Sequence, residues 1–132
     1  MRLLIVDDSL VVRNAIQRAV DEGTIAEVFR AEDGEEAVSL FSRERPELVT
    51  MDLTLPRLDG LRAIARIRAI EPRTSILVIS ALNSHKTAME AIALGACGFL
   101  TKPFTAREIA EALDDLAEHA TAAAAVANGG TP

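Results

Sequence analysis

The sequence predicts a doubly wound parallel α/β domain, and three observations favour this fold class. Five short apolar runs alternate strictly with five helical patterns along the 132 residues. The run Ser75–Ile79 is the most apolar of the five, which fits a parallel strand covered on both faces. Polar residues follow several of these runs directly. Since ligands bind beyond the carboxyl ends of the strands in such sheets, these polar residues mark a candidate site.

The first part of the chain predicts two strands and two helices. The strands are Leu3–Val6 and Glu27–Ala31. A helix from Ser9 to Val20 is expected between them, because positions 11, 12, 15, 16, 19 and 20 form one apolar stripe, and Gly23 suits its stop. A second helix is expected after Asp33, which offers an N-terminal cap with an acid three residues on; its buried face consists of Ala37, Val38 and Phe41.

The second part predicts three more strands, each followed by a helix. The strands are Glu47–Met51, Ser75–Ile79 and Phe99–Thr101. The helix Leu61–Ile70 turns Leu61, Ile64 and Ile67 inward and ends before Pro72, and the next runs from Ser84 to Leu94 and ends at Gly95. Thr105 and Glu108 form a capping box for the last helix, whose inner side carries Ile109, Ala112, Leu113 and Leu116.

The composition limits the classes of protein to consider. Hydrophobic residues make up 49% of the chain, so a disordered chain is excluded, and the core must consist of aliphatic residues with four Phe, because Trp and Tyr are absent. The net charge of −6 argues against a nucleic-acid-binding surface. Neither a signal segment nor a long apolar run is present, so we expect a cytoplasmic protein without membrane contact.

No functional role is expected for Cys97, His85, His119 or the tail. Cys97 has no partner at metal-ligand spacing and is expected to be a small packed residue in a reducing compartment. His85 and His119 are interpreted as surface residues. Residues 1–119 are expected to form the domain and 120–132 a flexible Ala/Gly-rich tail, although its alanines favour an extension of the last helix.

Acidic and basic residues stand where predicted strands end. Asp7 and Asp8 follow the first strand, Asp52 the third, Ser80 the fourth and Lys102 the fifth. Taken singly, Asp8 reads as a helix cap, Asp52 and Ser80 as turn residues, and Lys102 as a surface lysine. Their joint placement at one sheet edge instead predicts a site for a divalent cation and a phosphoryl group.

The chemistry of this constellation fits phosphoryl transfer. Clustered carboxylates repel one another, so a cation is needed to keep them ionised, and their hard oxygens suit Mg²⁺. An Asp carboxylate can attack phosphorus to form an acyl phosphate, and we assign this role to Asp52 because the loop after it leaves an open approach. Lys102 and Ser80 would contact oxygens of the transferring group.

These residues resemble the receiver domain of two-component response regulators. The matching segments are Leu4-Ile5-Val6-Asp7-Asp8-Ser9, Met51-Asp52-Leu53-Thr54-Leu55-Pro56-Arg57-Leu58-Asp59-Gly60, Ile79-Ser80-Ala81 and Lys102-Pro103-Phe104. The resemblance spans residues 2 to about 118, and the segments around Asp52 and Ser80 are most similar to chemotaxis-type, CheY-like regulators. It implies the strand order 2-1-3-4-5 of the flavodoxin/CheY-like fold, an order that belongs to the family and does not follow from the apolar pattern alone.

The resemblance also implies the roles of individual residues. Asp52 would accept a phosphoryl group from a sensor histidine kinase or a phosphotransfer protein. Asp8, Asp52 and the backbone carbonyl of Thr54 would bind Mg²⁺, with Asp7 in support and Mn²⁺ as a substitute. Lys102 would pair with the phosphate, and the Lys102–Pro103 peptide bond would be cis.

The same resemblance implies a conformational switch. Ser80 would move toward the phosphoryl group and Phe99, which otherwise reads as plain core packing, would rotate inward. The surface of the 84–94 helix, the strand Phe99–Thr101 and the last helix would then change and bind an output protein. Thr54 and Leu82 lack the amide or carboxylate that can orient an attacking water, so we expect slow self-dephosphorylation.

Three readings of the function stay open at this point. The first is a stand-alone bacterial signalling switch, not an enzyme in the usual sense, that acts as a monomer or a weak phosphorylation-dependent dimer and binds no nucleic acid. The second is a receiver module cut from a larger regulator, such as a transcription factor or a methylesterase. The third is a Mg²⁺-dependent phosphohydrolase of the haloacid-dehalogenase type, which Asp52-Leu53-Thr54 fits poorly because the second acid is absent.

Overall fold

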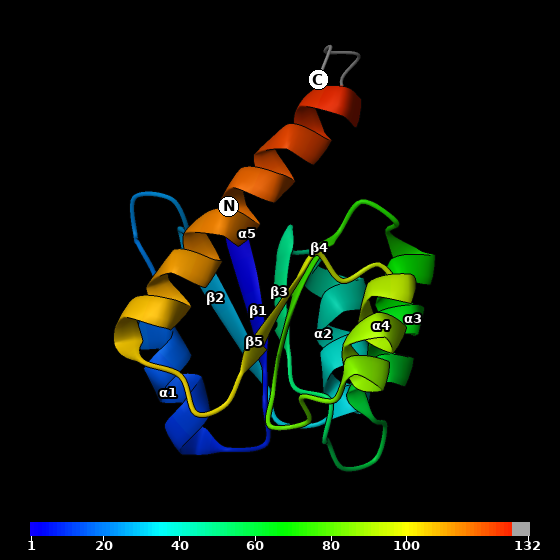
Figure 1. The fold of residues 1–132 in the computed structure, drawn as a ribbon. Helices are drawn as coiled ribbons and strands as arrows, with labels where there is room; N and C mark the ends of the chain where they lie inside the picture. Colours follow the sequence, from blue (N-terminus) through cyan, green and yellow to red (C-terminus); the bar gives the residue numbers. More distant parts are fainter. Residues whose placement is uncertain (128–132) are drawn as a thin grey trace.

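A single parallel sheet with helices on both faces forms the body of the protein in the computed structural model, which describes residues 1–127 (Figure 1). The five strands lie in the order β2-β1-β3-β4-β5, as the resemblance implied. Their bounds are β1 Arg2–Val6, β2 Glu27–Ala31, β3 Leu48–Met51, β4 Ser75–Ser80 and β5 Gly98–Thr101. All neighbouring strands pair in parallel, so the predicted fold class is confirmed.

In the described part of the chain, five helices alternate with the strands and cover the sheet in two layers (Figure 1). Their bounds are α1 Leu10–Arg18, α2 Gly34–Glu44, α3 Gly60–Ile70, α4 His85–Ala93 and α5 Ala106–Ala127. Figure 1 shows α1 and α5 on one face of the sheet, and α2, α3 and α4 on the other. Among these helices, none is both long and apolar enough to span a bilayer.

Each face of the sheet has its own hydrophobic core, because alternate strand residues point to opposite sides. On β1, Leu4 and Val6 join the cluster that includes Phe41 of α2 and Ile64 of α3. Leu3 and Ile5 face the other way and join Ile16 of α1 with Ile109, Leu113 and Leu116 of α5. The near-continuous apolar runs predicted from the sequence therefore reflect strands that are covered twice.

Helix starts follow the predicted capping chemistry. Asp33 accepts a hydrogen bond from the backbone N–H of Glu36 at 2.8 Å at the start of α2. The capping box of α5 is reciprocal: the Glu108 N–H donates to Thr105 Oγ1 at 3.1 Å, and the Thr105 N–H donates to Glu108 Oε1 at 2.9 Å. These bonds satisfy N–H groups that have no partner within the helix.

The first helix is shorter than predicted. It ends at Arg18 and not at Val20, and Gly23 does not stop it. The Asp21 carboxylate accepts hydrogen bonds from the Gly23 N–H and the Thr24 hydroxyl, both at 3.1 Å. A short polar side chain that bonds to nearby groups in this way favours a turn over further helix. Val20 still packs against the core, which explains why the apolar stripe included it.

Cys97 is exposed and not packed, so that prediction was wrong. It belongs to the loop before β5, where its thiol donates a hydrogen bond of 3.4 Å to the Ile76 carbonyl. His85 and His119 are exposed, as expected. His119 has an additional contact, because its Nδ1 lies 2.9 Å from the hydroxyl of Ser75, a fully buried residue at the start of β4.

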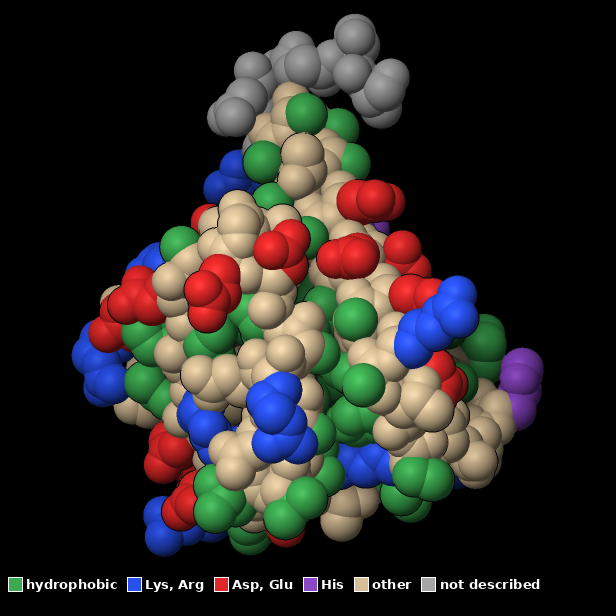
Figure 2. Space-filling view, turned by 90° about the vertical axis from the view of Figure 1, so that its left-hand side faces the viewer, with side chains coloured by type: hydrophobic (Ala, Val, Ile, Leu, Met, Phe, Trp, Pro, Cys, Tyr) green, Lys and Arg blue, Asp and Glu red, His purple; other side chains and the backbone are tan. Residues whose placement is uncertain are grey.

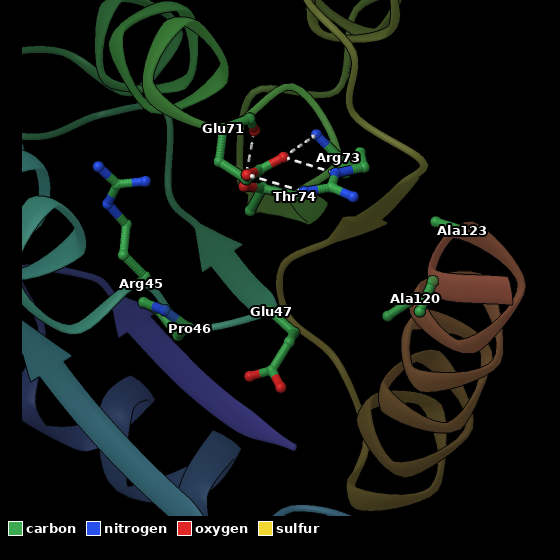
Figure 3. Close-up of a pocket in the computed structure, with 9 residues that line it drawn as sticks. Arg45, Pro46, Glu47, Glu71, Arg73, Thr74, Ala120 and Ala123 are labelled. Atoms are coloured by element: carbon green, nitrogen blue, oxygen red, sulfur yellow. Dashed lines mark hydrogen bonds and ion pairs between the residues drawn. The ribbon is translucent and has the colours of Figure 1, made fainter. Parts of the chain in front are cut away.

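Helix α5 continues through the alanine-rich segment to Ala127 and projects beyond the sheet (Figure 1). Ala120 still packs on the core, whereas residues 128–132 of the predicted tail lie outside the described residues. A pocket of about 290 Å³ lies beside this part of α5; Figure 3 shows Ala120 and Ala123 facing Glu47 and Thr74 across it. The pocket is at the amino-terminal edge of the sheet, away from the predicted site.

Charged side chains are spread over the face that carries α1 and α5 (Figure 2). Acidic side chains gather across the upper half of this view, below the projecting end of α5. This distribution is consistent with a chain whose net charge is −6.

Arg45 provides a test of local backbone strain. It ends α2 with a φ of 50°, in the left-handed region that favours glycine. Replacing exposed Arg45 by Gly should raise the free energy of unfolding by about 0.5–1 kcal/mol, because the side chain's steric cost disappears. Urea denaturation measures the change. The matched variant Arg43→Gly, inside the same helix, should lower stability by about 1 kcal/mol; equal losses in both variants would contradict the assignment.

Candidate functional site

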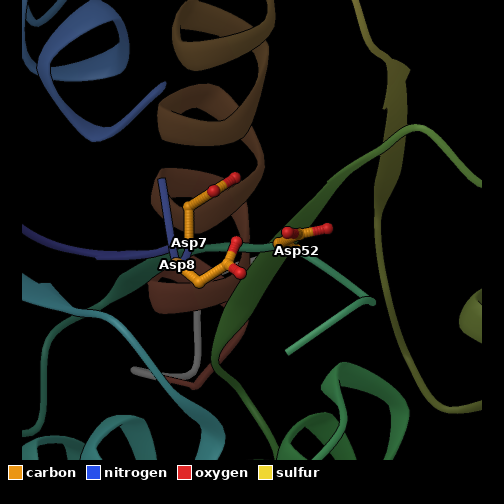
Figure 4. A group of neighbouring side chains, drawn as sticks. All are labelled: Asp7, Asp8 and Asp52. Carbon is orange, nitrogen blue, oxygen red and sulfur yellow. The ribbon is translucent and has the colours of Figure 1, made fainter. Parts of the chain in front are cut away.

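The carboxyl ends of two neighbouring strands, β1 and β3, bring the predicted acidic residues together. In the sheet register, Val6 pairs with Met51 and Met51 pairs with Val78. Asp7 and Asp52 are the next residues after the first two, so they leave neighbouring strands at the same height. Figure 4 shows Asp7, Asp8 and Asp52 side by side at this edge. One oxygen from each of the three carboxylates lies within 4.8 Å of the others.

Lys102 joins this group from the carboxyl end of β5, the edge strand two places from β3. Its Nζ lies 2.6 Å from Asp7 Oδ2 and 3.3 Å from Asp52 Oδ2. Both carboxylates are buried, Asp7 at 1% and Asp52 at 4% exposure, whereas Asp8 is exposed. The Lys102–Pro103 peptide bond is cis. A lysine that would read as an ordinary surface residue by itself therefore forms ion pairs with two buried acids.

Backbone groups fix the two buried carboxylates. Asp7 Oδ1 accepts a hydrogen bond from the Ser9 N–H at 2.9 Å, and Asp52 Oδ1 accepts one from the Thr54 N–H at 3.2 Å. The Asp52 N–H itself donates to the Val6 carbonyl at 3.0 Å, which continues the sheet pairing one residue past β3. Each acid thus has one oxygen held by the backbone and one directed to Lys102.

Ser80 lies at the same edge, but its hydroxyl is hydrogen-bonded to a neighbouring backbone group and not to the acids or Lys102. It is fully buried, and its hydroxyl accepts a hydrogen bond from the Leu82 N–H at 3.1 Å. Its carbonyl accepts from the Lys102 N–H at 3.0 Å, so the ends of β4 and β5 are joined directly. Phe99 lies opposite Val78 on β5 and is partly buried against the core. The predicted switch residues therefore belong to adjacent strands.

The loop after Asp52 is closed tightly onto the site. A Cβ on Gly60 would lie 2.2 Å from the Asp52 carbonyl oxygen, so only glycine permits this approach. Leu58 donates its N–H to the Pro56 carbonyl at 2.8 Å around Arg57, whose φ is 69°. These values describe a γ-turn with a positive φ, which is the rare and strained form of that turn. Thr54 is exposed near the start of this loop.

The electrostatics of the cluster make it unfavourable for Asp52 to be ionised beside the carboxylate of Asp7. Burial raises the pKa of Asp52, and the nearby charge of Asp7 raises it further, against the lowering effect of Lys102. Burial alone would lower the pKa of Lys102, but its hydrogen bond to Asp7 and the charges of both acids raise it overall. Three carboxylates with one ammonium leave excess negative charge, which fits a hard divalent cation such as Mg²⁺.

Sequence reasoning missed Arg13. Its guanidinium donates a hydrogen bond of 2.7 Å from Nη1 to the carbonyl oxygen of Asp7. Its spacing from Asp8 carried no signal by itself, because an arginine on the first turns of a helix normally points to solvent.

The raised pKa of Asp52 predicts the effect of removing its charge. A carboxyl group whose pKa is higher in the folded state binds more protons there, so stability falls as pH rises above the ordinary value of 3.8 through the folded pKa. Asp52→Asn should therefore increase the free energy of unfolding at pH 7 without Mg²⁺, by about 1 kcal/mol, a usual scale for point mutations.

Urea denaturation from pH 3 to 8 measures this effect. The gain should disappear at the acid end, where the native carboxyl is protonated in both states. Asp59→Asn is the matched control, because Asp59 is an exposed cap of α3 that asparagine can replace. A loss of stability in Asp52→Asn at pH 7 would show that attraction to Lys102 outweighs burial and repulsion.

Known proteins are similar in sequence to this chain over most of its length. Residues 3–114 match the family model of the response regulator receiver domain. A chemotaxis protein CheY from Listeria monocytogenes is 38% identical over 118 residues, which cover 89% of this chain and 99% of the relative. A protein-glutamate methylesterase/protein-glutamine glutaminase from Haloarcula marismortui is also 38% identical, over 99% of this chain but only 36% of that relative.

Solved structures agree with the sequence relatives. The response regulator domain of Thermotoga maritima CheB superposes with a TM-score of 0.79 at 28% identity, covering 92% of this chain and 96% of that one. A chain of the CheX-CheY-BeF₃-Mg²⁺ complex from Borrelia burgdorferi gives a TM-score of 0.82 at 25% identity, covering 88% of both chains. The chain therefore belongs to the response regulator receiver domain family, CheY-like signalling modules of two-component systems.

Proposed function

We propose that this chain is a single-domain response regulator that accepts a phosphoryl group on Asp52 and passes the signal to a partner protein. The observation that carries the proposal is the ion-paired group at the sheet edge: Lys102 Nζ lies within 3.3 Å of oxygens from both Asp7 and Asp52, and Asp8 lies beside them. This group offers a nucleophile, cation ligands and a fixed positive charge in one place.

Asp8, Asp52 and the backbone carbonyl of Thr54 would hold Mg²⁺ or Mn²⁺, with Asp7 in support. A bound Mg²⁺ would neutralise charge on the phosphoryl oxygens. The similar structure from Borrelia burgdorferi, whose name includes BeF₃ and Mg²⁺, supports a metal at this edge. The excess of carboxylates over ammonium groups in this chain supports it independently.

In the transfer step, an Asp52 carboxylate oxygen forms a bond to phosphorus as the bond from phosphorus to the donor's imidazole nitrogen breaks. The electron pair of the broken bond stays on that nitrogen. Lys102 would follow the negative charge from the carboxylate to the phosphoryl oxygens, because its Nζ already lies 3.3 Å from Asp52 Oδ2. The donor would be a sensor histidine kinase or a phosphotransfer protein.

The conformational change that reaches the output protein would begin at the carboxyl ends of β4 and β5. The Ser80 hydroxyl oxygen accepts a hydrogen bond from the Leu82 N–H, so its own O–H is still able to donate to a phosphoryl oxygen. A shift of Ser80 would free space for Phe99 on the adjacent strand and alter the face made by α4, β5 and α5. Met89 and Ile92 of α4 are about half exposed, at 51% and 54%, and offer apolar contacts to an output protein.

A second function, a receiver module within a longer regulator, has one specific observation in its favour. The methylesterase relative aligns with 99% of this chain over only 36% of its own length. The length of the native gene product distinguishes the two. A phosphohydrolase is a distant alternative, and turnover of a phosphomonoester would reveal it.

The phosphoacceptor can be identified with acetyl phosphate. The native chain should give a Mg²⁺-dependent shifted band on a phosphate-affinity gel, because acetyl phosphate supplies the phosphoryl group without a kinase. Asp52→Asn should give none, and Asp59→Asn should shift as the native chain does, since Asp59 only caps α3. A shift that persists in Asp52→Asn would place the modification elsewhere.

The lifetime of phospho-Asp52 should be long. Thr54 and Leu82 are exposed and carry no amide or carboxylate to orient water. We expect a lifetime well beyond seconds, and at least a several-fold faster loss in Thr54→Asn combined with Leu82→Glu. Decay of ³²P-labelled protein after removal of the donor measures both rates. A native lifetime of only seconds would contradict the prediction.

A further inference from the structure

Arg13 connects the first helix to the turn that carries the two neighbouring acids. Its Nη1 donates to the Asp7 carbonyl at 2.7 Å, and its side chain is only 11% exposed. Its other terminal nitrogen lies 4.0 Å from Glu32, whose side chain is 66% exposed, so that pair contributes little. The main bond of this guanidinium is therefore the one to the peptide group between Asp7 and Asp8.

The three carboxylates of the site differ in how they are held. Asp7 and Asp52 each have a backbone N–H on one oxygen and Lys102 near the other. Within residues 1–127, by contrast, no hydrogen bond or ion pair reaches the carboxylate of Asp8, which is exposed. The place of the Asp8 side chain therefore depends on the backbone that carries it.

The backbone on the amino side of this turn is well fixed. The Asp7 N–H donates to the Ala31 carbonyl at 3.1 Å, and the Asp7 side chain accepts from the Ser9 N–H. The orientation of the peptide plane between Asp7 and Asp8 is then set by its carbonyl oxygen. Arg13 is the donor bound to that oxygen, so it fixes the direction from which the Asp8 side chain leaves the chain.

We infer that Arg13 is a positioning residue for the divalent cation, acting on Asp8 through the Asp7–Asp8 peptide group. The inference rests on the proposed Mg²⁺ site and adds to it a residue that binds neither the cation nor the phosphoryl group. Groups that orient metal ligands in this way typically change metal affinity by about 10–100-fold when they are removed.

The charge of Arg13 and its positioning role change the affinity for Mg²⁺ in opposite directions. The sign of the affinity change on removing Arg13 therefore distinguishes the two. A guanidinium near the site repels Mg²⁺, so removal of a purely electrostatic Arg13 would strengthen Mg²⁺ binding. Removal of a positioning Arg13 weakens it. Arg13→Met keeps much of the side chain's length and removes both the charge and the donor. Arg13→Lys keeps the charge and a single donor.

Mg²⁺ affinity measured by titration calorimetry on the full chain tests the inference. We expect the dissociation constant to rise about tenfold in Arg13→Met, near the lower end for such groups, with Arg13→Lys between it and the native chain. The Mg²⁺-induced rise in the urea midpoint should shrink in the same order. At saturating Mg²⁺, Arg13→Met should again accept phosphoryl groups from acetyl phosphate, because the nucleophile and Lys102 are unchanged.

Arg18→Met is the matched control, since Arg18 is exposed on the same helix, and its affinity should equal that of the native chain. Unchanged or tighter Mg²⁺ binding in Arg13→Met, with native binding intact, would overturn the positioning role alone. Absence of Mg²⁺ binding in the native chain would overturn the proposed function, and the role of Arg13 with it. Denaturation without Mg²⁺ separates a loss of folding from a loss of affinity.

Discussion

The ammonium of Lys102 is the interaction on which the rest of the site depends. Two buried carboxylates, Asp7 and Asp52, would repel each other strongly in the interior of the protein. A single cation at 2.6 and 3.3 Å from their oxygens makes the arrangement tolerable without removing the excess negative charge. That excess would favour the divalent cation that we propose for this edge. The position of Lys102 after β5 thus stabilises the pair of buried acids in the folded state.

The two hydrophobic cores make this edge rigid. Residues of β1 and β3 pack alternately against α2 and α3 on one side and against α1 and α5 on the other. The strands cannot shift along one another without moving both sets of contacts, so the register that aligns Asp7 with Asp52 is fixed from both faces. The residues of the proposed site lie at the carboxyl ends of the strands or just beyond them. The strands and helices that form the two cores therefore provide stability, whereas the residues of the proposed site are adjacent to the cores but separate from them.

The site also contains points that can change. Ser80 is bonded to the Leu82 N–H and not to another side chain, and the loop after Asp52 includes a strained turn at Arg57. Asp8 depends on Arg13 and the backbone for its place. In the proposed switch, the buried acids would keep their places while the locally held partners, such as Ser80, would move in response to added charge. This division agrees with the switching role proposed for a receiver domain.

The sequence by itself determined the fold class and indicated which polar residues gather at one edge of the sheet. Alternating apolar runs and helical stripes are local patterns, and polar residues after strands such as β1, β3 and β5 mark the ligand-binding edge wherever the sheet is parallel. Local side-chain bonding explains where this reasoning failed: Asp21 ends α1 early by holding a turn, which an apolar stripe cannot reveal.

Only the tertiary structure decided how the site is held. The ion pairs of Lys102 with two acids from other strands, the contact of His119 with Ser75 and the exposure of Cys97 depend on strand order and on helix packing. The bond from Arg13 to the Asp7 carbonyl depends on the angle at which α1 leaves the sheet. These are distances between elements, and local sequence patterns carry no information about distances of that kind.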